Sequence, residues 1–302
     1  MDKNKIILNN GIAIPNIGYG SAIVLKYMWG NYTYKTIIKY WIKNFFKDRK
    51  QFVQDRALQK ILDIDLKEQM LIDTSRAYAG SENVIGKKIN KKRSEYFITT
   101  KLCNKDQYNN SVEQGFKESL RRLGTDYVDL YLMHWPVEGE FIESWKIMEK
   151  IYNQGLAKAI GVCNCNIHHL EKIKDNSEIM PMVNQFECHP LFTQSELRNY
   201  CKENKIQVMA YTPTARMDQR LYNTVLPDIA KKYNKSIAQI IIHWHMQIGN
   251  IPIVNTSSVK HLKENYDVFD FELTKEEISL INNININSRL RYDPDNCDFR
   301  KL

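Results

Sequence analysis

Short apolar runs rich in β-branched and aromatic residues recur along the chain, and amphipathic segments separate them. Runs of this length and composition are typical of buried strands. We therefore predict a strand at each of eight runs: residues 17–20, 70–73, 97–100, 127–133, 157–162, 181–186, 207–211 and 251–254.

The segments between the runs have the periodicity of amphipathic helices. Residues 111–124 place four apolar side chains on one helical face, namely Val112, Phe116, Leu120 and Leu123. Gly124 then provides a stop signal. Residues 193–205 and 236–249 show the same pattern, and we expect Thr193 to cap the first of these two helices.

Strands that alternate with helices predict parallel βαβ units, and eight such units close into a (β/α)8 TIM barrel. An open, doubly wound sheet is the alternative, but the phosphate-binding GxGxxG of that architecture does not follow the first strand. Asn10-Gly11, between two short apolar runs, predicts an N-terminal β-hairpin with a two-residue turn. No linker or repeat interrupts the chain, so we expect one barrel domain over residues 1–302.

The composition agrees with a globular protein that buries a sizeable core, since 43% of the residues are hydrophobic and 26% are charged. The net charge of +8 comes from Lys and Arg that alternate with acids, as in residues 87–95 and 261–267. This pattern is typical of solvated helix faces, so we expect no nucleic-acid partner, although a cleft that attracts a phosphorylated ligand fits equally well.

The cysteines do not form the framework of a small secreted domain, and no secretory leader is visible. We expect reduced thiols in a cytoplasmic protein. No apolar stretch approaches the roughly 20 residues of a membrane span. No four-ligand zinc spacing is visible, because His243 and His245 would face different directions on a helix, and we expect no metal.

Five polar residues lie just past apolar runs: Asp73 follows MLI, Lys101 follows FITT, His134 follows YVDLYLM, Asn164 follows AIGVC and Gln185 follows PMVN. In a parallel barrel these strand ends meet at one mouth, where barrel enzymes carry their reactive groups. Each residue alone has a structural explanation, such as a turn, a cap or a solvated charge. Five together favour a functional site.

Six motifs, in this order, resemble the motif series of the aldo-keto reductase family: LIDTSRAYAGSENVIGKKI, FITTKL, YVDLYLMHWP, AIGVCN, VNQFECHP and AYTP. The resemblance runs through nearly all of the chain except residues near 24–50. It implies a barrel that binds a nicotinamide nucleotide without a Rossmann motif and reduces an aldehyde or ketone to an alcohol.

The resemblance implies a catalytic tetrad of Asp73, Tyr78, Lys101 and His134. Hydride transfer builds negative charge on the carbonyl oxygen, which a proton donor and hydrogen bonds must meet. Tyr78 would donate the proton, and Lys101, positioned by Asp73, would lower the tyrosine pKa from about 10. His134 would orient the substrate oxygen, and Trp135 would form one wall of the substrate site.

The hydride must come from a cofactor, which the resemblance gives as NADP(H). Asn164 and Gln185 would hold the carboxamide, and Tyr211 would stack on the nicotinamide ring. The full set of implied cofactor-binding residues is Gly20, Ser21, Asp73, Cys163, Asn164, Gln185, Tyr211, Thr212, Asn255, Thr256, His261, Glu264 and Asn265.

Three residues of the implied cofactor site depart from the family. Cys163 replaces a serine, and a thiol is the weaker hydrogen-bonding group. Asn255 and His261 stand where the family has a Lys and an Arg for the 2′-phosphate. NAD(H) is therefore the open alternative to NADP(H), with Lys260, Lys263 and Arg216 as candidates to replace the missing charge.

The first connection of the barrel carries an aromatic and basic insertion near residues 24–50, and Ala22 stands where the family commonly has a Trp. One interpretation is a partly helical cover that shapes the substrate pocket. The others are a helix that packs on the rim and a membrane-surface or partner-binding helix.

Two functions remain open at this point. The first is an NAD(P)H-dependent oxidoreductase for a small-molecule carbonyl or alcohol, with no membrane span and, by family resemblance, a monomer. The alternative is a nucleotide-binding regulatory or scaffold barrel with little turnover. The complete tetrad favours the enzyme.

Overall fold

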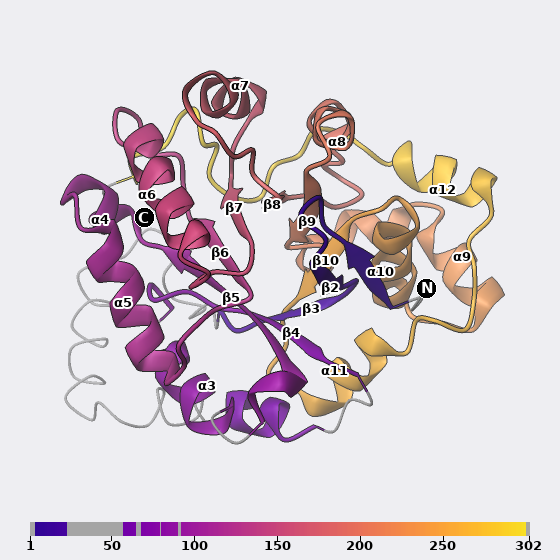
Figure 1. The fold of residues 1–302 in the computed structure, drawn as a ribbon. Coiled ribbons are helices and arrows are strands. Elements are labelled where there is room, and N and C mark those ends of the chain that lie inside the picture. The colour runs from indigo at the N-terminus through magenta and orange to yellow at the C-terminus, as the bar shows by residue number, and fades with distance from the viewer. Residues whose placement is uncertain (1–3, 23–56, 65–67, 79, 90–91, 300–302) are drawn as a thin grey trace, which may run out of the picture.

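In a computed structural model, residues 4–22, 57–64, 68–78, 80–89 and 92–299 are described. The insertion near residues 24–50, and the three interpretations of it, lie outside this part of the chain. Eight parallel strands form a closed barrel, which confirms the predicted fold class (Figure 1). The strands are β3 Gly18–Gly20, β4 Met70–Asp73, β5 Tyr96–Leu102, β6 Leu130–Met133, β7 Ile160–Cys163, β8 Val183–Glu187, β9 Gln207–Tyr211 and β10 Ile251–Val254.

All eight predicted strands are present, and the last pairs with the first to close the barrel, with Ile253 opposite Gly18. The strand predicted at residues 127–133 begins later, at β6, because Val128 makes only an isolated bridge to Ala157. The side chain of Asp129 accepts hydrogen bonds from Ile98 N and from Arg93, so the pairing is interrupted there.

Helices surround the barrel in the order expected for βα units (Figure 1). Residues 57–62 are helical, and the further helices are α3 Ser81–Ile89, α4 Asn104–Tyr108, α5 Val112–Leu123, α6 Phe141–Asn153, α7 Ile167–Asn176, α8 Ser195–Glu203, α9 Leu226–Tyr233, α10 Ile237–Gln247, α11 Val259–Tyr266 and α12 Lys275–Asn282. No helix of the described residues is long and apolar enough to cross a membrane.

Helix α5 has the predicted amphipathic face, with Val112, Phe116 and Leu123 buried. It ends at Gly124, whose φ of 61° is the left-handed conformation that glycine adopts without strain. The predicted cap of α8 is wrong: Gln194, not Thr193, occupies the N-cap position, and no side chain caps this helix. Thr193 instead donates its backbone N–H to Asn285.

The predicted hairpin is present and pairs β1 Lys5–Ile7 with β2 Ala13–Pro15. Its turn is one residue longer than predicted, because Gly11 N donates to Leu8 O while Leu8 N donates to Ile12 O. The side chains of Asn9 and Asn10 donate to the carbonyls of Lys205 and Lys158, which precede β9 and β7. The hairpin therefore closes the end of the barrel opposite the mouth.

Candidate active site

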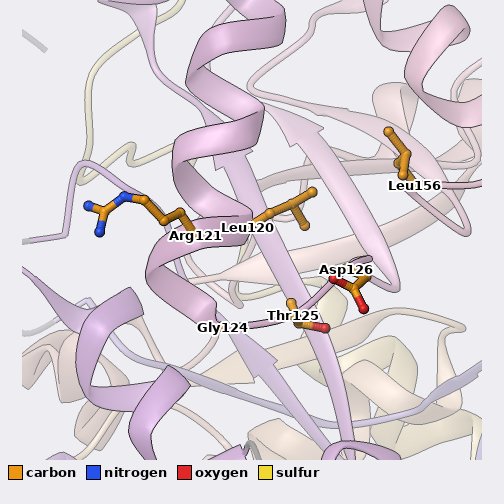
Figure 2. A pocket seen from close by; sticks show the side chains of 6 residues that line it. All are labelled: Leu120, Arg121, Gly124, Thr125, Asp126 and Leu156. Atoms are coloured by element: carbon orange, nitrogen blue, oxygen red, sulfur yellow. The ribbon is translucent and has the colours of Figure 1, made fainter.

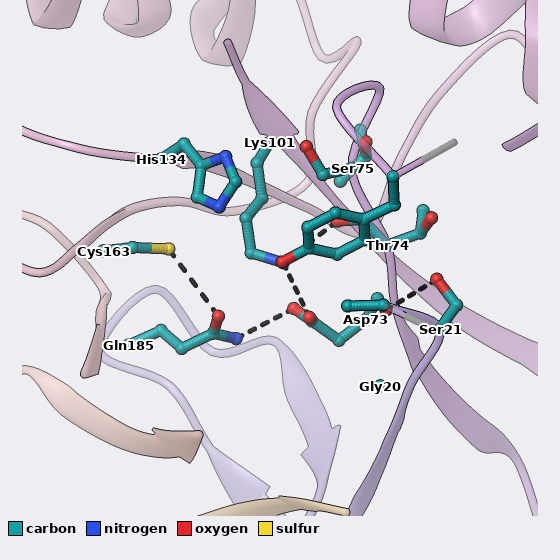
Figure 3. Close-up of polar contacts among 12 residues, drawn as sticks. Gly20, Ser21, Asp73, Thr74, Ser75, Lys101, His134, Cys163 and Gln185 are labelled. Atoms are coloured by element: carbon teal, nitrogen blue, oxygen red, sulfur yellow. Dashed lines mark hydrogen bonds and ion pairs between the residues drawn. The ribbon is translucent and has the colours of Figure 1, made fainter. Parts of the chain in front are cut away.

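The carboxyl ends of the strands bring most of the predicted site residues to one mouth. Asp73 is the last residue of β4, Lys101 lies near the end of β5, and His134 follows β6 directly. Cys163 ends β7 and pairs in register with Gln185 on β8. Figure 3 shows these side chains converging from their separate strands.

Lys101 connects two other members of the tetrad. Its Nζ lies 2.6 Å from Asp73 Oδ2 and 3.3 Å from the hydroxyl of Tyr78, and it also donates to Thr74 O at 3.0 Å. The Lys101 side chain is 1% exposed and the Asp73 side chain is 5% exposed, so the ion pair is almost fully removed from water. A buried ammonium held in this way directs its charge at the phenol oxygen.

Burial works to lower the pKa of Lys101, but Asp73 and then Tyr78 outweigh it and raise the pKa above its ordinary value. The lysine is therefore an ammonium group at neutral pH. This is the state in which it can stabilise negative charge on a neighbouring oxygen.

Lys101 acts on the pKa of Tyr78 in the predicted direction and lowers it, but the net pKa is raised. Burial raises that pKa, and the opposing effect of Lys101 is the smaller of the two. The sequence could show a lysine near the tyrosine but not how deeply the phenol is buried. The consequence is that Tyr78 keeps its proton, as a proton donor must.

A short turn holds Tyr78 next to β4. Tyr78 N donates to Ser75 O, and Ser81 N donates to Tyr78 O. Arg76, within the same turn, forms an ion pair with Asp106 of α4. The turn that carries the phenol is thus fastened to the neighbouring βα unit.

His134 faces Tyr78 edge to face, with ring centroids 5.7 Å apart. Burial, followed by the charges of Lys101 and Arg291, lowers the pKa of His134 to about 3. The imidazole is therefore neutral at physiological pH and can donate one hydrogen bond to a substrate oxygen without carrying charge.

A chain of hydrogen bonds runs from the tetrad to the predicted nicotinamide residues (Figure 3). Gln185 Nε2 donates to Asp73 Oδ1 at 2.8 Å, and the thiol of Cys163 lies 3.8 Å from Gln185 Oε1. Asn164 Nδ2 donates to His134 O at 3.0 Å, and the Tyr211 hydroxyl donates to Asn164 Oδ1 at 2.7 Å. These side chains are brought together as predicted.

The donors and acceptors at this mouth fit a carboxamide. Among the described residues Gln185 Oε1 has only the long thiol contact, so an amide N–H₂ can replace that weak partner at little cost. Two loop residues have left-handed backbones, Asn164 with φ 59° and Thr212 with φ 52°. Such a conformation is uncommon for a β-branched residue such as Thr212 and is typical of functional loops.

The predicted phosphate segment lies beside the end of β3. Asn255 donates from Nδ2 to Gly20 O at 2.7 Å and to Ala22 O at 2.6 Å, so its amide group fastens the first strand. Thr256 Oγ1 accepts from Ser258 N, and Ser258 caps α11. His261 lies on the exposed surface of that helix, with Glu264 and Asn265 in the following turn. Ser21 donates to Asp73 O, which places it between this segment and the tetrad.

A hollow elsewhere on the surface does not belong to this site (Figure 2). Its lining residues are Leu120, Arg121, Gly124, Thr125, Asp126 and Leu156. They lie where α5 ends and where the chain approaches β6 and β7, which is the end of the barrel opposite the catalytic mouth. None of the predicted site residues lines it.

Sequence reasoning missed two groups of residues near the mouth. Glu187 and His189 form a fully buried pair, with 2.9 Å between Glu187 Oε1 and His189 Nε2. His168, His169 and Asp295 gather at α7. Asp295 lies in the C-terminal segment, whose contacts depend on the tertiary fold, so no local pattern could reveal this second group.

Comparison with known proteins identifies the family of the chain. The profile of the Aldo/keto reductase family matches residues 46–286. The uncharacterized oxidoreductase YtbE of Bacillus subtilis (strain 168) is 46% identical over 235 residues, which cover 76% of this chain and 83% of that protein. Glyoxal reductase of the same strain is 39% identical over 299 residues, or 98% of each chain.

A solved structure shares the whole fold. The aldo-keto reductase of Bombyx mori in complex with NADP has a TM-score of 0.80 against this chain, at 30% identity. The similarity covers 96% of this chain and 95% of that chain. By the family profile, by the curated relatives and by the fold, the chain belongs to the Aldo/keto reductase family.

Proposed function

We propose that this protein reduces an aldehyde or ketone to an alcohol with a nicotinamide nucleotide, and that Tyr78 is the proton donor. The observation that carries the proposal is the position of Lys101 Nζ, 2.6 Å from Asp73 and 3.3 Å from the Tyr78 hydroxyl. An ammonium group fixed at this point stabilises the phenolate that remains after the proton leaves.

Gln185 and Asn164 would hold the carboxamide of a bound nicotinamide, which would supply the hydride. The residues of the chain do the rest. As negative charge develops on the carbonyl oxygen, Tyr78 transfers its hydroxyl proton to that oxygen. Neutral His134 donates a hydrogen bond to the same oxygen and so holds it near the phenol. The products would be an alcohol, the oxidised nucleotide and a Tyr78 phenolate paired with Lys101. Solvent then returns a proton to the phenolate.

We propose NADP(H) as the cofactor, since a related enzyme binds NADP in its solved structure. The replaced residues Asn255 and His261 are the reason to test NADH beside NADPH. A clear preference for NADH in the ratio of kcat/KM values would reject this choice.

The name of the related glyoxal reductase points to small dicarbonyls as the first substrates to try. The deciding experiment is steady-state oxidation of NADPH with glyoxal, methylglyoxal and a panel of aldehydes and ketones, by the wild type and by Tyr78→Phe. We expect turnover in the wild type and its loss in the variant. Nucleotide binding without turnover in the wild type would instead favour the nucleotide-binding scaffold.

A further inference from the structure

The segment after α12 crosses the catalytic mouth of the barrel (Figure 1). We call residues 285–299 the tail. At its start Ser288 N donates to Leu191 O at 2.9 Å, beyond the end of β8. At its other end Asn104 Nδ2 donates to Phe299 O at 3.1 Å, just beyond β5. The tail therefore spans the rim from one side of the barrel to the other.

Glu187, the last residue of β8, holds the middle of the tail. Its Oε1 accepts from Leu290 N at 2.7 Å, and its Oε2 accepts from Arg291 N at 3.0 Å. The residue is 0% exposed. Both oxygens of a buried carboxylate are thus committed to two successive backbone amides, which is a strong, charge-assisted arrangement.

His189 completes the coordination of this carboxylate. Its Nε2 lies 2.9 Å from Glu187 Oε1, while its Nδ1 has no hydrogen-bond partner among the described residues. The ring proton of a neutral imidazole therefore belongs on Nε2, where it donates to Glu187. The carboxylate receives three donors, and a neutral amide could not accept all of them.

The clamped part of the tail lies within reach of the catalytic residues. Glu187 is opposite Tyr211 in the sheet register and two positions beyond Gln185 on the same strand. After burial and Lys101, the charge of Arg291 contributes to the low pKa of His134. The ring of Phe299 lies 6.0 Å from that of Trp135, which directly follows His134. The tail thus contacts Trp135, the residue predicted to form one wall of the substrate site.

A second, more exposed contact fastens the tail to α7. Asp295 accepts from Asn166 Nδ2 at 2.7 Å and lies 3.4 Å from His168 Nε2. With His169, these residues have the composition of a metal site, but His169 Nδ1 accepts the backbone N–H of Asn166. The proton of the neutral ring is then on Nε2, toward Asp295, where a metal would need a lone pair. The contact is a hydrogen-bonded tether.

We propose that Glu187 is a positioning residue for carbonyl reduction: it fixes the backbone of Leu290 and Arg291, and so holds the tail as a wall of the substrate site beside Trp135. The proposal rests on the proposed function. Glu187 does not touch the reacting atoms. It decides which carbonyl compounds fit, whereas the tetrad carries out the proton transfer.

The test is Glu187→Gln, which places an N–H₂ group against a backbone N–H and removes one acceptor. Hydrogen exchange of the Leu290 and Arg291 amides should accelerate at least about tenfold, the equivalent of one lost hydrogen bond. KM for a bulky aromatic aldehyde should change about tenfold, while kcat for methylglyoxal stays within about twofold. Glu196→Gln, on the exposed face of α8, is the matched control and should change neither measurement.

Phe299→Ala tests the same wall without a change in the core. If Glu187→Gln does not fold, this variant alone tests whether the tail is a wall of the substrate site. It should reproduce the change in KM for the bulky aldehyde. If the Leu290 and Arg291 amides stay protected in Glu187→Gln, the proposal that Glu187 fixes the tail is wrong. Faster exchange with unaltered KM values would show that the tail is not a wall of the substrate site. An unaltered KM for the bulky aldehyde in Phe299→Ala would show the same. A wild type without turnover would reject the proposed function. The exchange result would still test whether Glu187 fixes the Leu290 and Arg291 amides.

Discussion

Gln185 Nε2 donates a 2.8 Å hydrogen bond to Oδ1 of Asp73, across the barrel from β8 to β4. The other carboxylate oxygen of Asp73 is paired with Lys101 at 2.6 Å. One acid therefore connects the side of the mouth proposed for the nucleotide with the side proposed for proton donation. A substitution of Asp73 should therefore alter the contacts of both Gln185 and Lys101.

Asp73→Asn should lower kcat by about 10²-fold, the effect of losing one electrostatic stabiliser of a transition state. The carboxylate is what raises the pKa of Lys101 against burial, so in the variant burial prevails and that pKa falls. Activity should then decline at a lower pH on the alkaline side of the kcat profile. The control is Asp63→Asn, whose exposed pair with Lys88 is remote from the mouth. An unshifted alkaline limb would contradict this account of Lys101.

Gly115→Ala should disturb the turn that carries Tyr78. A Cβ at this position would lie 2.5 Å from Asp106 Oδ2 and 3.1 Å from an Arg76 nitrogen, so the ion pair must move. We expect a loss of about 1–3 kcal/mol in the free energy of unfolding, as for an overpacked core. We also expect a fall in kcat for every substrate. Urea unfolding and steady-state kinetics measure the two effects, and Gln114→Ala, on the exposed face of α5, should show neither.

His261→Arg should improve the use of NADPH. His261 is exposed on α11, where the family resemblance places an arginine for the 2′-phosphate. A new exposed ion pair is worth up to about 1 kcal/mol, or roughly a fivefold lower KM for NADPH. KM for NADH should not change, and His261→Gln should leave both constants near their wild-type values. An equal gain for both nucleotides would show that His261 does not face the 2′-phosphate.

Acid should destabilise the fold through His245. Burial lowers the pKa of His245 to about 3, against an ordinary value of 6.5. Below pH 6.5 the unfolded chain binds a proton that the folded chain does not, so this contribution is complete above pH 6.5 and is lost as the pH falls toward 3. Its slope reaches about 1.4 kcal/mol per pH unit.

His245→Gln removes this proton linkage. Urea unfolding at several pH values should give a shallower decline below pH 6.5 for the variant, and parallel curves from pH 7.5 to 9. The variant can be less stable throughout, because it also alters the hydrogen bond from His245 Nε2 to Pro213 O. Identical slopes below pH 6.5 would contradict the assignment.

The strands could be predicted because their signals are local, whereas the tetrad is implied by the family resemblance. Each strand is a short apolar run, and Asp73 and Tyr78 lie in one motif. The net pKa of Tyr78 could not be predicted, because it depends on how much water the whole mouth excludes. Glu187 could not be identified for another reason. Its partners Leu290 and Arg291 are about a hundred residues away in the sequence, and only the fold brings them together.

The cap of α8 shows the limit of a purely local argument. Thr193 is a good capping residue by type, but the tertiary contact of its backbone with Asn285 displaces it from that role. The hydrogen bond of Gln185 with Asp73 is similar: both residues are in the implied cofactor-binding set, but nothing in the sequence pairs them with each other. Sequence patterns predict which residues belong to a site better than they predict which residues contact one another.

The described part of the barrel is covered by the hairpin of β1 and β2 at the end opposite the mouth. With its base closed by the contacts of Asn9 and Asn10, nucleotide and substrate must use the same entrance. The groups expected to hold the nicotinamide, such as Gln185, lie deeper than Trp135 and Phe299 at the rim. The molecule that binds deeper must arrive first and depart last. We therefore expect compulsory-order kinetics in which the nucleotide binds first, with the hairpin on the far side of the barrel as one cause.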